Sequence, residues 1–250
     1  MKLFVDVGNT FMKWRMREGD RVRQGSRAHE RDWPALAREL SSVATEVPRE
    51  IHIASVAGPE GDRLLRERLT ERFGREPAFY YSEAQACGVR NAYSQARRLG
   101  VDRWLAVIEA WHRHGEAIVI DCGSAVTVDA VAGARHLGGY IVPGLAMLRG
   151  GLLQNTADVH VSAVRTPSLA PGSSTTEGVE NGILLMSVAF ITRAVVELRR
   201  SLPDTCSVLL TGGDAPALMP WLDEAPVHVP DLVLDGLERR VTAGLYAGGE

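Results

Sequence analysis

The sequence predicts an α/β protein with two halves of related topology, each a mixed sheet with flanking helices, divided near Gly115. Two observations lead to this fold class. Short apolar strands alternate along the chain with segments of helical periodicity, which is typical of α/β proteins. The apolar run that opens at Leu3 also ends at Asp6, a glycine and small polar residues, and the same order returns in Ala117–Ala125. We therefore expect one domain over residues 1–115 and a second over 116–250.

The first half is expected to hold an antiparallel meander followed by helix, strand, helix and strand. The turn Glu18-Gly19-Asp20 predicts a hairpin. Asp32 and Pro34 predict the capped start of a helix that runs to about Val47. The other expected elements are strands over 13–17, 21–27, 51–56 and 78–81, helices over 61–73 and 101–112, and a loop over 88–100.

The second half is expected to repeat the meander and to end in helices. Its expected elements are strands from 117 and over 126–132, 137–142, 206–210 and 227–229, helices over 145–154, 176–200 and 232–247, and a loop over 161–173. The helix over 176–200 is apolar on more than one face, which predicts burial all round. Either a dimer interface or a central position in a monomer would bury it.

Bulk composition limits the class of partner. The chain has 250 residues and a net charge of −3, so it lacks the basic surface that binds nucleic acid. Its apolar runs are shorter than the roughly 20 residues that span a bilayer, and no signal peptide is visible. Its three cysteines have no C-x-x-C spacing and fit a reducing compartment. We expect a cytoplasmic protein that binds neither nucleic acid nor membrane.

The stretch Asp6-Val7-Gly8-Asn9-Thr10 combines groups that suit bound phosphates. Gly8 allows another group to approach the main chain, and backbone N–H groups of a tight turn can hold an anion. Asp6 could hold a divalent cation or its water. An ordinary hairpin turn explains this stretch equally well by itself. The recurrence at Asp121 and a third turn at Thr211-Gly212-Gly213 instead indicate a nucleotide cleft between the halves, without a P-loop or Rossmann fingerprint.

These turns resemble the phosphate-1, phosphate-2 and adenosine motifs of the sugar-kinase, Hsp70 and actin superfamily, whose domains have a ribonuclease-H-like (actin-like ATPase) fold. Within that superfamily, five motifs in register across nearly the whole chain resemble the type III pantothenate kinases. They are Asp6–Thr10 with Lys13-Trp14, Tyr93 with Leu99–Arg103, Asp121–Asp129, Gly138–Gly144 and Thr175–Gly182.

The resemblance implies ATP-dependent phosphorylation of pantothenate to 4′-phosphopantothenate, the first step of coenzyme A biosynthesis, by a homodimer that needs Mg²⁺ and a monovalent cation, K⁺ or NH₄⁺. It implies that Asp102 is the general base, that Asp121 holds the monovalent cation, and that Asp6 holds Mg²⁺ through water. ATP would be bound by Asp6, Val7, Gly8, Asn9, Thr10, Phe11, Met12, Lys13 and Ser124, and pantothenate by Tyr93, Gly100, Val101, Asp102, Arg103 and Thr175.

Each assignment has a simpler alternative. Asp102 could simply be a first-turn carboxylate that interacts favourably with the helix macrodipole, and Arg103 could form a surface ion pair. Either Thr175 or Ser174 could be the N-cap of the following helix. Tyr93 could be a half-buried loop aromatic. Ser124 stands where the family usually has threonine, which keeps the hydroxyl and loses a methyl. A non-catalytic nucleotide-binding protein of the same fold and another kinase or phosphatase of the superfamily stay open, although the presence of Asp102 with Arg103 favours the kinase.

Overall fold

The computed structural model describes residues 1–156, 161 and 167–247, which divide into two compact units. Unit 1 comprises Met1–Glu109 and Asp231–Glu250, and unit 2 comprises Ala110–Pro230. Each unit contains a mixed sheet with flanking helices, which confirms the predicted fold class. The predicted boundaries 1–115 and 116–250 assign the C-terminal helix to the second half, whereas the contacts of this helix place it in unit 1.

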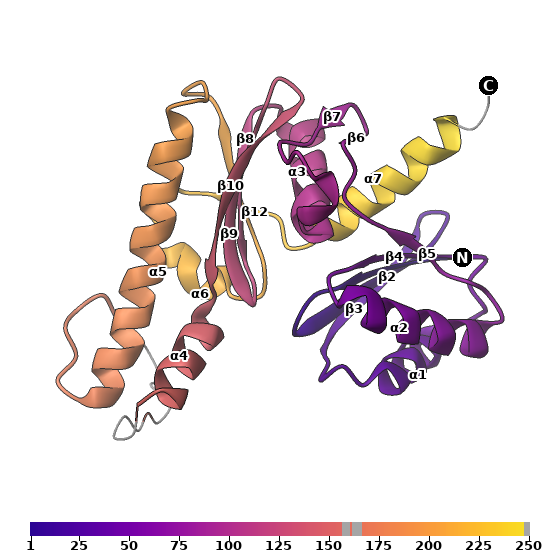
Figure 1. The fold of residues 1–250 in the computed structure, drawn as a ribbon, viewed down its shortest axis with the longest axis horizontal. Coiled ribbons are helices and arrows are strands. Elements are labelled where there is room, and N and C mark those ends of the chain that lie inside the picture. The colour runs from indigo at the N-terminus through magenta and orange to yellow at the C-terminus, as the bar shows by residue number, and fades with distance from the viewer. Residues whose placement is uncertain (157–160, 162–166, 248–250) are drawn as a thin grey trace. The chain divides into compact units, whose positions relative to one another are not determined.

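Unit 1 is built on a five-stranded sheet in the order β3-β2-β1-β4-β5 (Figure 1). The first three strands are antiparallel neighbours, and β4 and β5 run parallel to β1. Its elements are β1 (Lys2–Val7), β2 (Phe11–Glu18), β3 (Arg21–Ala28), α1 (Trp33–Val43), β4 (Glu50–Ser55), α2 (Gly58–Phe73), β5 (Ala78–Tyr80), β6 (Gln85–Ala86), β7 (Val89–Arg90), η1 (Ala96–Arg98), the start of α3 (Val101–His114), and α7 (Leu232–Ala247).

Local signals account for the hairpin and for the start of α1. Gly19 has φ +56° in the turn between β2 and β3, a conformation that favours glycine. The Asp32 carboxylate accepts a hydrogen bond from the Ala35 N–H at 2.9 Å and caps α1, as predicted. The helix ends at Val43 and not near Val47. Its predicted last turn contains β-branched residues and precedes a proline, both of which disfavour the helical conformation.

The two faces of the unit 1 sheet have different partners. One face carries the apolar core, in which β1 and β2 pack with α1 and α2. On the other face, Arg15 and Arg17 of β2 contact α7. The buried Arg15 donates to Asp235 at 2.6 Å, and Arg17 donates to Glu238 at 2.9 Å. These ion pairs explain why the C-terminal helix belongs to unit 1, because a buried guanidinium needs a charged partner.

His52 of β4 is a buried titratable group on the face of the sheet opposite this core, because its neighbours Ile51 and Ile53 are the core residues. Its Nδ1 lies 3.1 Å from the Tyr80 hydroxyl, its Nε2 lies 3.0 Å from Glu50, and its ring stacks on Phe4 with centroids 5.2 Å apart. Burial lowers the pKa of His52 from its ordinary value of 6.5, and this outweighs the opposite effect of Glu50. The unfolded chain therefore binds this proton more readily than the folded protein does.

We expect the contribution of neutral His52 to the free energy of unfolding to be at its full value above pH 6.5. This contribution should be lost as the pH falls through the lowered pKa of His52. Urea unfolding at pH 7.5 and pH 5.5 measures this difference. His52→Gln should reduce the difference, because glutamine does not titrate, whereas His228→Gln at an exposed site should leave it unchanged. Equal pH dependence in the wild type and in His52→Gln would contradict the assignment.

Within unit 2 the strands lie in the order β12-β11-β8-β9-β10 (Figure 1). Strand β8 is antiparallel to β9 and parallel to β11, so the predicted second meander is present. The elements are β8 (Ala117–Cys122), β9 (Ala125–Ala132), β10 (Arg135–Pro143), α4 (Leu145–Gln154), α5 (Thr175–Arg199), β11 (Ser207–Thr211), α6 (Ala215–Leu218), η2 (Met219–Trp221) and β12 (Val227–His228). Residues 162–166 of the predicted loop over 161–173 lie outside the described residues, and its described residues, 161 and 167–173, form no helix or strand, as predicted.

Helix α5 is the core helix of unit 2. Its length and composition would allow it to cross a membrane, but half of its most apolar window is buried inside the protein. Leu184, Val188 and Ile191 pack in the core with residues of β8 and β9. A single chain does not bury the helix all round, because Leu185 and Met186 are each 50% exposed. Of the two predicted ways to bury the helix all round, the central position in a monomer is therefore wrong, and burial by a dimer interface stays a prediction.

Candidate active site

The phosphate-1 turn, Gly8–Thr10, joins β1 to β2 in unit 1. The Gly8 N–H donates to the Phe11 carbonyl at 2.9 Å, and a Cβ at Gly8 would lie only 3.1 Å from that oxygen. Any larger residue would crowd this contact. Asn9, Thr10 and Phe11 are exposed, so the turn presents their backbone and side chains at the surface.

The residues on either side of the turn differ in what they can offer a ligand. Asp6 and Lys13 are directly opposite in the antiparallel register of β1 and β2, and both are partly accessible. This places a carboxylate and an ammonium on the same face of adjacent strands. Val7 and Met12 are completely buried in the core of unit 1. They support the turn from within and do not line its surface.

The start of α3 brings three of the predicted substrate residues together. The Arg103 N–H donates to Asp102 Oδ1 at 2.7 Å, and Arg103 Nη1 donates to the Tyr93 hydroxyl at 3.3 Å. A Cβ at Gly100 would lie 2.5 Å from the same Asp102 oxygen, so glycine leaves the space that this carboxylate occupies. Val101 is buried and packs in the core. The polar side chains of this group are therefore those of Asp102, Arg103 and Tyr93.

Charge and burial favour an anionic ligand at Arg103. The Arg103 side chain is only 9% exposed, and the Tyr93 hydroxyl contacts one of its terminal nitrogens. The Tyr93 backbone is fixed in turn, because its N–H donates to Asn91 Oδ1 at 2.9 Å. A guanidinium held in one orientation can bind a carboxylate through two parallel hydrogen bonds. Arg103 is not the surface residue that the simpler alternative required.

Unit 1 also contains a cavity of about 720 Å³, but the side chains of Asp102, Arg103 and Tyr93 do not line it. It is lined by Ser82, Glu83, Ala84 and Gln95–Arg98. Volume alone does not identify a reactive site. We therefore place the candidate site where the carboxylate, the buried arginine and the tyrosine converge.

In unit 2 the second and third glycine turns meet at one edge of the sheet. Strands β8 and β11 are parallel with Asp121 opposite Thr211, so both turns leave the sheet at the carboxyl ends of adjacent strands, where α/β proteins bind ligands. Gly212 has φ +96°, and a Cβ there would lie 2.5 Å from Asp121 Oδ1 and 2.4 Å from the Cys122 carbonyl oxygen. The Asp214 N–H donates to that same carbonyl at 2.8 Å.

The start of α4 completes this edge. The Gly144 N–H donates to the Ser124 carbonyl at 3.0 Å, and a Cβ at Gly144 would lie 2.4 Å from the Gly123 carbonyl oxygen. The turn that carries Ser124 is thus packed directly against the glycine that precedes α4. The glycine at the end of the motif Gly138–Gly144 therefore has a physical reason, since a residue with a Cβ could not approach the Gly123 carbonyl so closely.

The electrostatics at this edge involve Arg149, which was not identified from the sequence. Burial raises the pKa of Asp214, and Arg149 of α4 opposes this shift. Arg149 is itself held by Glu180 of α5, to which its Nε donates at 2.6 Å. Burial, with smaller contributions from Asp121 and Asp214, raises the pKa of Cys122 far above its usual range, so this thiol stays neutral. Glu180 lies inside the motif Thr175–Gly182, but nothing in the sequence linked it to Arg149.

Thr175 is the first residue of α5 and is exposed. The helix is capped by Ser174, whose side chain accepts a hydrogen bond from the Glu177 N–H at 3.2 Å. Glu177 in turn accepts from the Ser173 N–H and hydroxyl, each at 2.7 Å. This is the reciprocal pattern of a capping box shifted by one residue. The alternative that Thr175 is the N-cap is therefore wrong, and its hydroxyl lies at an exposed helix start.

Two mixed sheets whose strands end in acidic, glycine-bearing turns define a member of the actin-like ATPase fold. A solved structure supports this class. The protein from Campylobacter jejuni assigned to the Baf family of transcriptional activators superposes with a TM-score of 0.61 at 18% identity, over 98% of this chain and 99% of that chain. At this identity the likeness concerns the fold alone.

Sequence comparison identifies the family. A family model described as type III pantothenate kinase matches residues 2–197. The protein of that name from Alcanivorax borkumensis is 54% identical over 240 residues, which cover 96% of this chain and 98% of the relative. The one from Ectopseudomonas mendocina is 39% identical over 244 residues, with 95% and 97% covered. The chain therefore belongs to the type III pantothenate kinases, which transfer a phosphoryl group from ATP to pantothenate in the first step of coenzyme A biosynthesis.

Proposed function

We propose that Asp102 is the general base that accepts the proton of the pantothenate hydroxyl as the γ-phosphoryl group is transferred. One observation carries this role: Gly100 leaves the space in which the Asp102 carboxylate is held by the Arg103 N–H. A carboxylate held in a fixed position can accept a proton from a hydroxyl within hydrogen-bond reach. Phosphoryl transfer depends on positioning and on charge neutralisation, so a fixed carboxylate suits this reaction.

Arg103 and Tyr93 would bind pantothenate, with the guanidinium paired to the substrate carboxylate. The support is the burial of Arg103 and its contact with the Tyr93 hydroxyl. A buried cation gains most from an anionic partner, because it has given up much of its hydration. Thr175 would add a hydroxyl at the exposed start of α5.

ATP would be held by the phosphate-1 turn and by Ser124. The exposed Asn9 offers a backbone N–H that can hold an anion, and Lys13 offers a positive charge on β2. Ser124 retains the hydroxyl of the family threonine and lies on the turn packed against Gly144. Val7 and Met12 contribute only by supporting the turn from the core.

The residues present fit a monovalent cation at Asp121. Asp121 Oδ1 and the Cys122 carbonyl oxygen lie close together, since each is within 2.5 Å of the position that a Cβ at Gly212 would take, and both are oxygen ligands of the kind that hold a cation. K⁺ or NH₄⁺ bound there would offset part of the negative charge of the ATP phosphates. Asp6 would hold Mg²⁺ through water, since Mg²⁺ in kinases takes one or two carboxylates plus phosphates. Among the described residues no three His, Cys, Asp or Glu side chains cluster as a metal site.

The rate at which the purified protein phosphorylates pantothenate with ATP, in the presence of Mg²⁺, is expected to rise about tenfold when KCl or NH₄Cl replaces tetramethylammonium chloride at equal ionic strength. Asp121→Asn should remove most of this stimulation, because an amide lacks the charge that attracts the cation. The measurement is ADP release at matched salt. No turnover in KCl, or equal rates in all three salts, would contradict the proposal.

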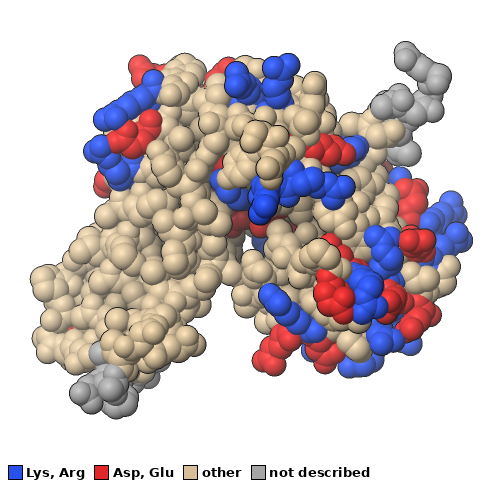
Figure 2. All heavy atoms as spheres, viewed as in Figure 1, with Lys and Arg blue, Asp and Glu red and all other residues tan. Residues whose placement is uncertain are grey.

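We also infer that the protein is a homodimer in the cytoplasm. Leu185, Ala189 and Val196 share one exposed face of α5, and Met186 lies beside them. Tyr140 of β10 extends this face, because its ring packs edge-on against Phe190 of α5 with centroids 6.5 Å apart. Figure 2 shows few charged side chains over α4 and the adjoining part of α5. Exposed apolar patches of this kind mark interfaces, and a second copy would cover this one.

Leu185→Asp is expected to convert the dimer to a monomer at micromolar concentration, because a charge would have to be buried at the interface. Size-exclusion chromatography with light scattering should give half the wild-type mass. Val22→Asp on β3, which is also an exposed apolar position, is the matched control and should leave the mass unchanged. A monomeric wild type would refute the inferred assembly.

A further inference from the structure

We propose that His29 is a positioning residue that fixes the phosphate-1 turn in the orientation that binds ATP. This inference rests on the proposed role of Asp6–Lys13 in ATP binding. His29 follows β3 and lies far from the turn in sequence, and none of the family motifs identified in the sequence includes it.

Two hydrogen bonds connect His29 to the turn. The His29 backbone N–H donates to the Thr10 carbonyl at 2.8 Å, and His29 Nε2 lies 3.0 Å from the Gly8 carbonyl oxygen. The carbonyl groups at the beginning and at the end of the turn are thus both held by one residue. With the Gly8 N–H bonded to the Phe11 carbonyl, the turn is fixed at three backbone groups.

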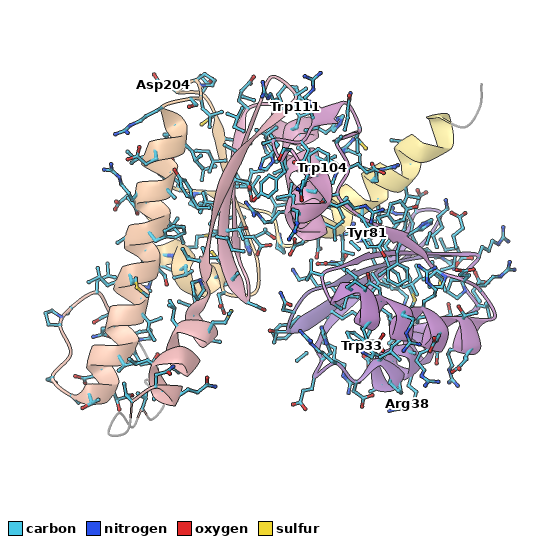
Figure 3. The ribbon with its side chains drawn as sticks, viewed as in Figure 1. Trp33, Arg38, Tyr81, Trp104, Trp111 and Asp204 are labelled. Atoms are coloured by element: carbon cyan, nitrogen blue, oxygen red, sulfur yellow. The ribbon has the colours of Figure 1, made fainter. Side chains whose placement is uncertain are left out.

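The surroundings of the ring determine which nitrogen carries the proton. The Arg31 N–H donates to His29 Nδ1 at 3.3 Å, so Nδ1 is an acceptor. In a neutral imidazole the other nitrogen then carries the hydrogen. His29 Nε2–H therefore donates to the Gly8 carbonyl. Trp33, labelled in Figure 3, is buried and lies beside the ring with centroids 5.7 Å apart, which limits rotation of the imidazole.

The bond to Gly8 has a consequence for the next residue. The Gly8 carbonyl and the Asn9 N–H belong to one peptide group, and the described residues contain no cis peptide bond. In a trans peptide these two groups point in opposite directions. By holding the Gly8 carbonyl, His29 directs the Asn9 N–H away from itself at an exposed position of the turn. An N–H aimed in this way is the group that a phosphate-binding turn requires.

The test compares His29→Ala with His29→Gln, whose side-chain amide retains an N–H donor. Isothermal titration measures the Kd of ATP, steady-state kinetics measure KM for pantothenate, and thermal unfolding measures Tm. We expect His29→Ala to raise the Kd of ATP about fivefold and His29→Gln to restore it to within about twofold. The pantothenate KM should change little in either variant. His228→Ala, at an exposed histidine of β12, is the matched control for all three measurements.

An unchanged ATP Kd in His29→Ala would overturn the inference. Equal losses for ATP and pantothenate, or a failure of His29→Gln to recover affinity, would also overturn it, because a purely structural role predicts those results. Lys13→Ala separates this inference from the proposed function. If Lys13→Ala weakens ATP binding and His29→Ala does not, only the role of His29 fails. If Lys13→Ala has no effect, the ATP-binding role of the turn fails, and the inference fails with it.

Discussion

Asp102→Asn is expected to lower kcat about a thousandfold while the Kd values of ATP and pantothenate stay within a few-fold of the wild type. Asparagine has nearly the shape of aspartate, so it fits beside Gly100 and its amide oxygen still accepts the Arg103 N–H. It cannot accept the proton of the attacking hydroxyl. The loss should therefore appear in the chemical step and not in binding, which ADP release and isothermal titration measure separately.

The matched control is Asp204→Asn, an aspartate in the exposed turn that follows α5 (Figure 3). This variant should retain full activity. If Asp102→Asn keeps more than about a tenth of the wild-type rate, Asp102 does not act as the general base. If kcat is unchanged and pantothenate binding is lost, Asp102 binds substrate and some other group accepts the proton.

Gly212→Ala is expected to lower the free energy of unfolding by about 3 kcal/mol, or Tm by roughly 10 °C. Two effects add at this position. The φ of +96° is unfavourable for alanine, and its Cβ would lie 2.4 Å from the Cys122 carbonyl oxygen. Relief of this contact requires the ends of β8 and β11 to move apart. The Asp121 carboxylate would move with them, so K⁺ stimulation and ATP affinity should fall as well.

Gly213→Ala provides the comparison for stability. Gly213 is the next residue, is exposed, has no positive φ, and a Cβ there would have nothing within 4 Å. The Tm of Gly213→Ala should stay within about 2 °C of the wild-type value, since substitutions at exposed positions without special contacts have small effects. Equal destabilisation by the two alanines would show that the clash at Gly212 is not the cause.

The sequence predicted those features that depend on neighbouring residues. The hairpin at Gly19 and the cap at Asp32 follow from turn and capping preferences that act over a few residues. The glycine turns were recognisable because their pattern recurs. The end of α1 was placed four residues too far along, since its apolar periodicity continued past the point where β-branched residues and Pro48 disfavour a helix.

Features that depend on distant residues were not predictable from one sequence. The pairing of Arg149 with Glu180, the contact of His29 with Gly8 and the packing of α7 on unit 1 each join segments that local patterns do not connect. For the candidate site, the sequence indicated Asp102 with Arg103, but only the structure reveals that Arg103 is buried against Tyr93. The cap of α5, by contrast, is a local feature: the sequence allowed Ser174 or Thr175, and the structure assigns it to Ser174.

The membership of α7 in unit 1 affects the order in which the chain can fold as it is synthesised. The strands of unit 1 are synthesised before unit 2, but Asp235 and Glu238, the partners of Arg15 and Arg17, are synthesised after it. Unit 2, residues 110–230, is available in full before then. Unit 1 therefore starts to be synthesised before unit 2 but can complete its folding only after unit 2 has been made. A premature stop just before Asp231 would leave Arg15 without these partners and damage the N-terminal half of the protein.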